Sequence, residues 1–173
     1  MSAQCAAPLG QGVKSSRQFC DVLITQTPAD SVIVTIPARS GTATLLFDLH
    51  ARFSVTSANT PQYIAYAQHL ALVTVIRPNG TVIGRGVVNQ TYRSPLDLFD
   101  QISGGGGPGG AKGIAPGKVE PVSITIPTNV NTVGIVGVTL TVTNRLGEQT
   151  SDAPGTPIAI VSNIRLTYTP GRQ

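Results

Sequence analysis

The sequence predicts an all-β protein, an antiparallel β-sandwich or jelly roll of about eight strands. The main observation is a two-residue alternation of apolar and polar residues between positions 42 and 55. One face of this segment carries Leu45, Phe47, Leu49, Ala51, Phe53 and Val55. Side chains in a strand switch face at every residue, so the pattern is typical of a long strand with one dry face. Similar patterns recur to the C-terminus, which indicates two packed antiparallel sheets.

Composition supports the same fold class. The 173 residues are 40% hydrophobic, but only 12% are charged and 5% aromatic. Val, Ile and Thr make up the difference, and these β-branched residues suit a pleated sheet. A chain of this length fits one domain with a sizeable core. We expect an N-terminal arm over 1–20 and a single sandwich domain over 21–173.

Eight strands are expected in chain order, at 21–26, 31–36, 42–55, 62–76, 81–93, 121–126, 133–143 and 157–168. Pro28 presets the turn between the first two strands. The stretch 62–70 is also compatible with a helix that begins after Thr60-Pro61, but the all-β context favours a strand. Asn79-Gly80 is the preferred pair of a type I′ hairpin turn, so the strands on either side of it should pair antiparallel.

The pattern changes after residue 93. Ser94 and Pro95, with Asp97 in the first turn, predict a short helix near 95–102. A glycine-rich loop follows it and extends to Lys118. After the sheet resumes, a loop over 148–156 should separate the last two strands.

The two cysteines, Cys5 and Cys20, both precede the first predicted strand. A disulfide between them would close a ring of about 15 residues and contribute about 3 kcal/mol in the chain-entropy model. It would pin a polar arm that has little to pack with, and it would indicate an oxidising compartment. Two unrelated free thiols are the alternative. Residues 1–4 show no apolar signal segment, so the chain is either a mature secreted protein or one with its natural start at Met1.

The charge pattern bears on the choice of partner. The formal net charge is +4, but the basic residues are scattered and aromatic residues do not interleave with them. Nucleic acid is therefore not an expected partner. No stretch approaches the roughly 20 apolar residues that a membrane-spanning helix needs. A surface rich in Thr, Ser, Asn, Gln and Gly indicates a protein partner or self-association.

The glycine-rich loop is the first candidate binding site, through Gly105, Gly107, Gly110, Lys112 and Lys118. Glycines let backbone N–H groups approach an anion, and the lysines add positive charge. The phosphate-loop pattern is absent, because only three residues separate Gly113 from Gly117-Lys118 and valine follows. A flexible connection between sheets, or a loop ordered by a neighbouring subunit, remain the alternatives to anion binding.

The second candidate is the polar face of the long strand, where Asp48, His50 and Arg52 alternate with core residues. Alternate positions lie about 7 Å apart, so the three side chains could face one ligand. A solvated or cross-strand-paired polar face is the alternative interpretation. His69 is the only other histidine, and neither histidine belongs to a metal-ligand motif, so we expect no metal and no cofactor.

No catalytic constellation emerges from the sequence. Ser40-Gly41 and Ser103-Gly104 lack a nucleophile-elbow pattern, and tryptophan, a common sugar-stacking residue, is absent. The leading prediction is a non-catalytic extracellular or periplasmic module that acts by surface binding or assembly. The alternatives are a structural subunit of a larger shell or filament, and a hydrolase with a site near Asp48 and His50.

Overall fold

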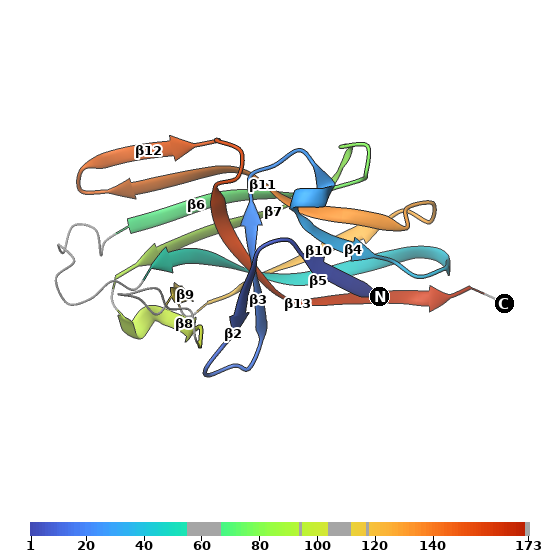
Figure 1. The fold of residues 1–173 in the computed structure, drawn as a ribbon, viewed down its shortest axis with the longest axis horizontal. Coiled ribbons are helices and arrows are strands. Elements are labelled where there is room, and N and C mark those ends of the chain that lie inside the picture. The colour runs from blue at the N-terminus through green and yellow to red at the C-terminus, as the bar shows by residue number, and fades with distance from the viewer. Residues whose placement is uncertain (55–66, 94, 104–111, 117, 172–173) are drawn as a thin grey trace.

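The computed structural model describes residues 1–54, 67–93, 95–103, 112–116 and 118–171 (Figure 1). These residues form two antiparallel sheets, one of six strands and one of seven. The predicted all-β sandwich is therefore confirmed. The predicted number of strands was too low, because several strands of four or five residues are too short to show a periodic pattern.

The six-stranded sheet has the strand order β1 (Ser2–Cys5), β4 (Val32–Thr35), β11 (Thr132–Asn144), β6 (Ala67–Ile76) and β7 (Val82–Tyr92). In addition, β12 (Gly147–Ser151) pairs with the C-terminal end of β11. The β6–β7 hairpin is antiparallel, as Asn79-Gly80 predicted. Its turn contains a bond from Thr81 N–H to Asn79 Oδ1 at 3.0 Å.

The seven-stranded sheet has the strand order β2 (Pro8–Gln11), β3 (Gln18–Leu23), β13 (Pro157–Pro170), β5 (Arg39–Ser54), β9 (Lys112–Pro116) and β8 (Leu98–Gln101). In addition, β10 (Glu120–Ile126) pairs with β5. The long predicted strand is β5, the central strand of this sheet. It pairs with β13 along one edge and with β10 and β9 along the other.

The core lies between the two sheets. From β5 it receives the apolar residues of the alternating pattern, namely Ala43, Leu45, Phe47, Leu49 and Ala51, which are at most 2% exposed. The predicted burial of Phe47 and Leu49 is thus confirmed. Burying a side chain of this size contributes about 1.5–3 kcal/mol. The stability of the sandwich therefore depends strongly on this one strand.

The last strand, β13, does not keep one face toward this core. Bulges interrupt its ladders beside Ile158 and at Asn163, which adopts a left-handed φ of 54°. Each bulge adds a residue and reverses the alternation. Strict alternation would put Ile160 on the same inward face as Ile158, but Ile160 lies on the outer face of the seven-stranded sheet.

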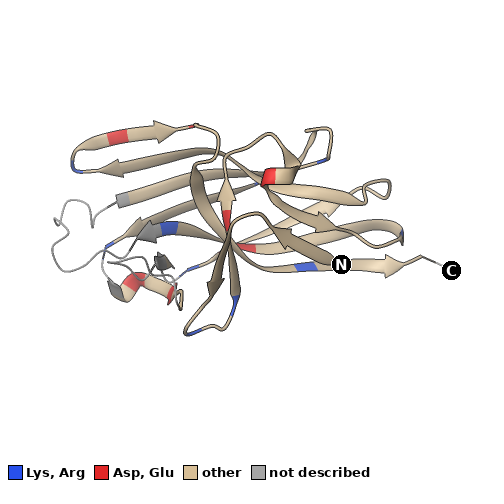
Figure 2. Cartoon of the chain, in the orientation of Figure 1, with Lys and Arg blue, Asp and Glu red and all other residues tan. Residues whose placement is uncertain are grey.

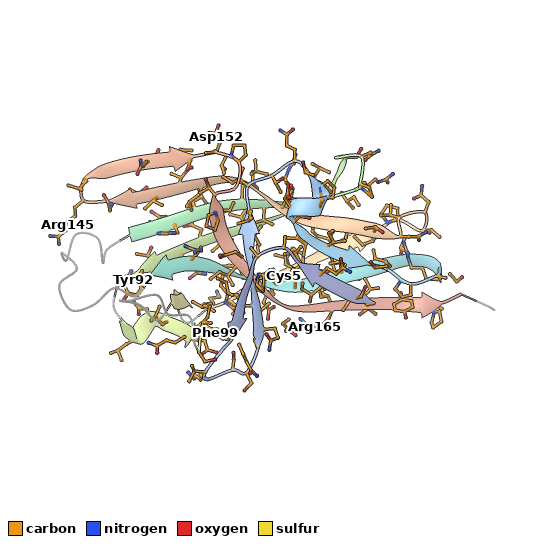
Figure 3. All side chains as sticks on the ribbon, in the orientation of Figure 1. Cys5, Tyr92, Phe99, Arg145, Asp152 and Arg165 are labelled. Atoms are coloured by element: carbon orange, nitrogen blue, oxygen red, sulfur yellow. A yellow bond between two sulfur atoms is a disulfide. The ribbon has the colours of Figure 1, made fainter. Side chains whose placement is uncertain are left out.

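A second, smaller apolar cluster covers that outer face. It consists of Phe19, Ile102, Ile114 and Ile160, with Leu9 and Phe99 packed against them. Leu9 comes from β2 and Phe99 from β8, and Figure 3 labels Phe99 where these strands meet. The two ends of the seven-stranded sheet, β2–β3 and β8, therefore curl over its own outer face, where Gly12 bridges to Ile102, and form a local covering layer around this cluster.

The helix predicted near 95–102 is wrong. A single 3₁₀ turn, η2 (Pro95–Asp97), leads directly into the strand β8, which pairs with β9. The proline and the acidic residue start one turn, but burial of Ile102 and Asp100 beneath the N-terminal segment favours extended backbone. A second 3₁₀ turn, η1 (Pro28–Asp30), occupies the predicted turn between β3 and β4. The predicted loop over 148–156 begins as strand β12.

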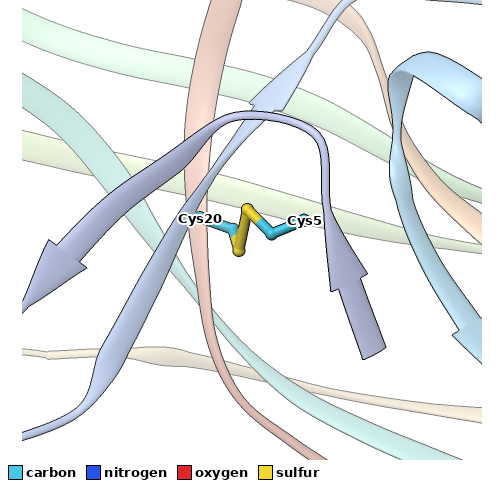
Figure 4. The surroundings of a disulfide bond; sticks show 2 residues. All are labelled: Cys5 and Cys20. Carbon is cyan, nitrogen blue, oxygen red and sulfur yellow. A yellow bond between two sulfur atoms is a disulfide. The ribbon is translucent and has the colours of Figure 1, made fainter. Parts of the chain in front are cut away.

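The first twenty residues belong to both sheets. β1 pairs with β4 in the six-stranded sheet, and β2 pairs with β3 in the seven-stranded sheet. A disulfide joins Cys5 at the end of β1 to Cys20 on β3, with their Cα atoms 6.0 Å apart (Figure 4). It therefore links one sheet to the other. Among the described residues, no helix has the length and apolar character needed to cross a membrane.

Candidate functional site

Asp48, His50 and Arg52 lie on one face of β5, as the alternation predicted, but that face is not solvated. Asp48 is 5% exposed and His50 is fully buried, because β2, β3 and β8 cover this part of the sheet. The interpretation as a solvated face was therefore wrong, whereas the contacts of Asp48 and His50 with β13 agree with a cross-strand-paired face. The covering residues come from short segments with no apolar period, so no local pattern indicated that this face would be covered.

His50 is held between two aromatic rings. Its ring centroid lies 5.5 Å from that of Phe19 in an edge-on arrangement and 5.0 Å from that of Phe99. Its Nε2 atom is 2.8 Å from Ser162 Oγ on the neighbouring strand β13. Burial lowers the pKa of His50 from 6.5 to about 4, with Arg17 acting in the same direction and nearby Asp48 opposing it. The imidazole is therefore neutral near pH 7.

Asp48 is neutralised by a cation from the N-terminal segment. Arg17 Nη1 lies 2.6 Å from Asp48 Oδ2 and also donates to Ser162 Oγ at 3.3 Å. Asn163, at the left-handed bulge of β13, donates from Nδ2 to the same Oδ2 atom at 3.0 Å. The guanidinium carbon of Arg17 lies 5.1 Å from the centre of the Phe99 ring. We refer to Arg17, Asp48, His50, Ser162 and Asn163 as the outer-face cluster.

Arg52 does not join this cluster. Its Nε atom donates to Asp21 Oδ1 at 2.8 Å, and its Nη2 atom to Asp21 Oδ2 at 3.4 Å. Asp21 comes from β3 and is almost completely buried. The structure thus separates the predicted trio into two ion pairs, each formed with a residue that precedes β5 in the chain.

Asp100 fixes the loop between β2 and β3. Its carboxylate accepts bonds from the N–H groups of Lys14 and Ser15, both at 2.8 Å, and from the Ser15 hydroxyl. Burial raises the pKa of Asp100, but these bonds together with one from Gln101 N–H outweigh burial and hold it below its ordinary value. Gly12 leaves room for the Asp100 contact, since a Cβ at this position would collide with the Asp100 carboxylate and would lie 2.7 Å from both Ser15 Oγ and the Phe19 ring. Asp100 is therefore a structural anchor for the layer that covers His50.

The cluster contains a serine–histidine contact, the arrangement that activates a nucleophile in many hydrolases. A working base also needs a partner that orients its second ring nitrogen. Within the described residues, His50 Nδ1 has no hydrogen-bond partner, and the carboxylate of Asp48 is occupied by Arg17 and Asn163. Ser162 is only 2% exposed. The geometry is therefore poorly suited to catalysis, and its contacts connect β5, β13 and the N-terminal segment.

An open groove of about 470 Å³ runs beside this cluster. Arg17, Ser162 and Asn163 form one part of its wall, and Cys5 and Cys20 form another. The remaining lining residues are Ala3, Gln4, Pro8, Gln18, Phe19, Val32, Val161 and Ile164. Arg17, Ser162 and Asn163 each make at least one hydrogen bond inside the protein.

A larger open groove, of about 1260 Å³, crosses the outer face of the six-stranded sheet. Leu72, Thr74 and Val136 contribute to it from neighbouring strands, and Arg85 and Asp152 supply charges of opposite sign. Figure 2 shows the basic residues spread over several elements rather than gathered in one patch. No group of three or more His, Cys, Asp or Glu residues in the described ranges is placed to hold a metal ion.

The glycine-rich candidate lies largely outside the described residues. This applies to Gly105, Gly107 and Gly110, while Lys112 begins strand β9. Lys118 is exposed, and its carbonyl oxygen accepts a bond from Gln90 Nε2 at 3.0 Å. A binding role for this loop stays a prediction.

Sequence reasoning missed four residues that the structure places around Asp48 and His50. These residues are Arg17, Ser162, Asn163 and Asp100. A signal existed in β3 and β5, where Asp21, Asp48 and Arg52 interrupt otherwise apolar strands, because buried charges require partners. The partners themselves come from distant parts of the chain and could not be located from spacing.

Comparison with known proteins assigns no relationship to the chain. No protein-family model matches it, and no curated protein or solved structure matches it significantly.

Proposed function

We propose that this protein is a non-catalytic β-sandwich module of an extracellular or periplasmic compartment that acts through its surface, in binding or assembly. The observation that carries the proposal is the state of the outer-face cluster. Arg17 is paired with Asp48, and His50 with Ser162, so the cluster holds β5, β13 and the N-terminal segment together. What remains for contact with other molecules is a surface of low charge.

The compartment is supported by the disulfide. A bond between Cys5 and Cys20 persists in oxidising surroundings and is rare in reducing ones. The described residues contain no other cysteine. The scarcity of charged residues agrees with a module that works outside the cytosol.

A hydrolase is the second candidate, because His50 Nε2 lies 2.8 Å from Ser162 Oγ. Against it stands the low pKa of His50, about 4, which makes the imidazole a weak base near pH 7. Within the described residues no carboxylate orients His50 Nδ1, and Ser162 is buried; both observations oppose a hydrolase further.

Labelling with a fluorophosphonate, which modifies activated serines, separates the two functions. The folded protein should show no mass increase after incubation with the probe. Ser162→Ala is the matched control, since it removes the serine that contacts His50. Labelling of the wild type that disappears in Ser162→Ala would overturn the non-catalytic proposal. Absence of labelling in both proteins supports it.

Light scattering of the purified protein addresses the choice between a module and a subunit of a shell or filament. A module should give a monomer or a small discrete oligomer at all concentrations. A mass that keeps growing with protein concentration would instead favour the shell or filament subunit.

A further inference from the structure

Strand β7 is an edge strand of the six-stranded sheet. It pairs with β6 on one side, and within the described residues its other side has no strand partner. It contains eleven residues, none of them proline, and its only charged residue is Arg85. Val82 and Val87 are 45% and 47% exposed on it. Long apolar edges of this kind readily pair with another strand.

Other edges of the sandwich carry features that prevent such pairing. β10, the neighbouring edge of the seven-stranded sheet, contains exposed Pro121, which has no N–H to donate. The outer half of β13 is bent by the bulge at Asn163 and carries Arg165. β1 and β12 are only four and five residues long. The contrast singles out β7 as the edge suited to strand addition.

We propose that β7 pairs antiparallel with β7 of a second copy of this chain, which would extend the six-stranded sheet across a two-fold axis. This inference rests on the proposed surface function and names its partner. A two-fold contact brings the same patch of both copies together, so the patch must be complementary to itself. The residues of β7 meet this condition in one register.

That register follows from the regular part of the strand. From Gly84 to Tyr92, β7 forms an unbroken ladder with β6, while a register shift occurs near Val82. Pairing these nine residues in full with their own copy places the axis at Val88. Arg85 then faces Thr91 of the second copy, so like charges do not meet. Pairing about Arg85 instead would place two guanidinium groups opposite each other.

The inward face of β7 is also self-complementary in this register. Gly84 would lie opposite Tyr92 of the second copy, and Gly86 opposite Gln90. The glycines themselves cannot be enlarged, since a Cβ on Gly84 would lie 2.8 Å from Ile124 and one on Gly86 2.9 Å from Val122.

Sedimentation equilibrium of the intact protein tests the pairing. The wild type should show a reversible dimer at concentrations up to about 100 µM, a range that covers weak to moderate association. Val87→Lys should weaken the dimer by roughly tenfold or more, because charged residues on an edge oppose strand addition. Val13→Lys is the matched control: it makes the same exchange at a 65% exposed site in the β2–β3 loop and should leave the dimer unchanged.

Disulfide trapping tests the register. Val87 and Asn89 of the second copy are opposite each other, so the double variant V87C/N89C should form a covalent dimer that a reductant dissolves. The variant V87C/T91C keeps the same number of added cysteines but places neither opposite the other, and it should cross-link much less. Equal cross-linking of both variants would overturn the register.

A wild type that stays monomeric, or a dimer that Val87→Lys and Val13→Lys weaken equally, would overturn the β7 pairing. Neither result would contradict the non-catalytic proposal, which is tested separately by whether a fluorophosphonate labels Ser162. Conversely, labelling of Ser162 would overturn the proposed function and leave the measured mass of the dimer as it is. Thermal melting of Val87→Lys and Val13→Lys establishes that both variants are folded.

Discussion

Acid should destabilise this protein between pH 7 and pH 5, and His50 should account for much of the effect. Its pKa in the folded protein is about 4, against 6.5 for an ordinary histidine. In that window the unfolded chain binds a proton at His50 and the folded protein does not. Stability is therefore fully present above pH 6.5 and is lost as the pH falls toward 4.

The magnitude follows from the two pKa values. Between pH 7 and pH 5, a histidine with pKa values of 6.5 unfolded and about 4 folded lowers the free energy of unfolding by about 2 kcal/mol. Burial also lowers the pKa of His69 to about 4, but its side chain is partly exposed, so its contribution should be smaller. The wild type should thus lose about 2–4 kcal/mol. Asp100, with a pKa below its ordinary value of 3.8, stays ionised throughout and does not contribute.

Urea unfolding of wild type and His50→Gln at both pH values measures this effect. The loss between pH 7 and pH 5 should be about 2 kcal/mol smaller in His50→Gln, whatever its stability at pH 7. His69→Gln is the control for the second histidine. Titration of the histidine Cε1 proton resonances gives the pKa values directly, since the chain has only two histidines. A His50 midpoint near 6.5, or an unchanged loss in His50→Gln, would refute the reasoning.

Three further outcomes follow from the packing. Reduction of the Cys5–Cys20 disulfide should lower the free energy of unfolding by about 3 kcal/mol, as measured by urea unfolding with and without dithiothreitol, and the unreduced, unfolded protein should titrate no free thiols. Phe47→Ala should lower it by roughly 3–5 kcal/mol, because the ring is completely buried in the main core. Arg17→Ala should lower it by about 2–3 kcal/mol by leaving the Asp48 carboxylate without its cation, and Asp48→Asn added to Arg17→Ala should recover part of the loss; no recovery would show that the ion pair is not the cause.

The sandwich could be predicted from the sequence because the patterns that specify it involve residues close together in the chain. The alternation in β5 and the Asn79-Gly80 turn each depend on neighbouring residues, and both determine strand direction and face without knowledge of the rest of the chain. The dry face of β5 was correct for the same reason, with Phe47 at its centre.

The candidate site could not be predicted, because the residues that form it are far apart in the sequence. In the outer-face cluster, Arg17 is bonded to Asp48, 31 positions later in the chain, and to Ser162, 145 positions later. The layer that buries His50 depends on Phe99 and on strands of four residues, which carry no period. The bulge at Asn163, which positions Ser162 and its neighbours on β13, has no strong signature in sequence either.

The disulfide between the two sheets also has a mechanical consequence. A pulling force applied at the N-terminus would peel β1 from β4 only as far as Cys5, and the load would then pass through the sulfur atoms to Cys20 on β3. The intervening residues would bear no tension while the bond is intact. At about 3.4 Å per extended residue, a separation of 15 residues corresponds to about 50 Å of chain that is released only after reduction. In single-molecule stretching, the oxidised protein should therefore extend about 50 Å less than the reduced protein.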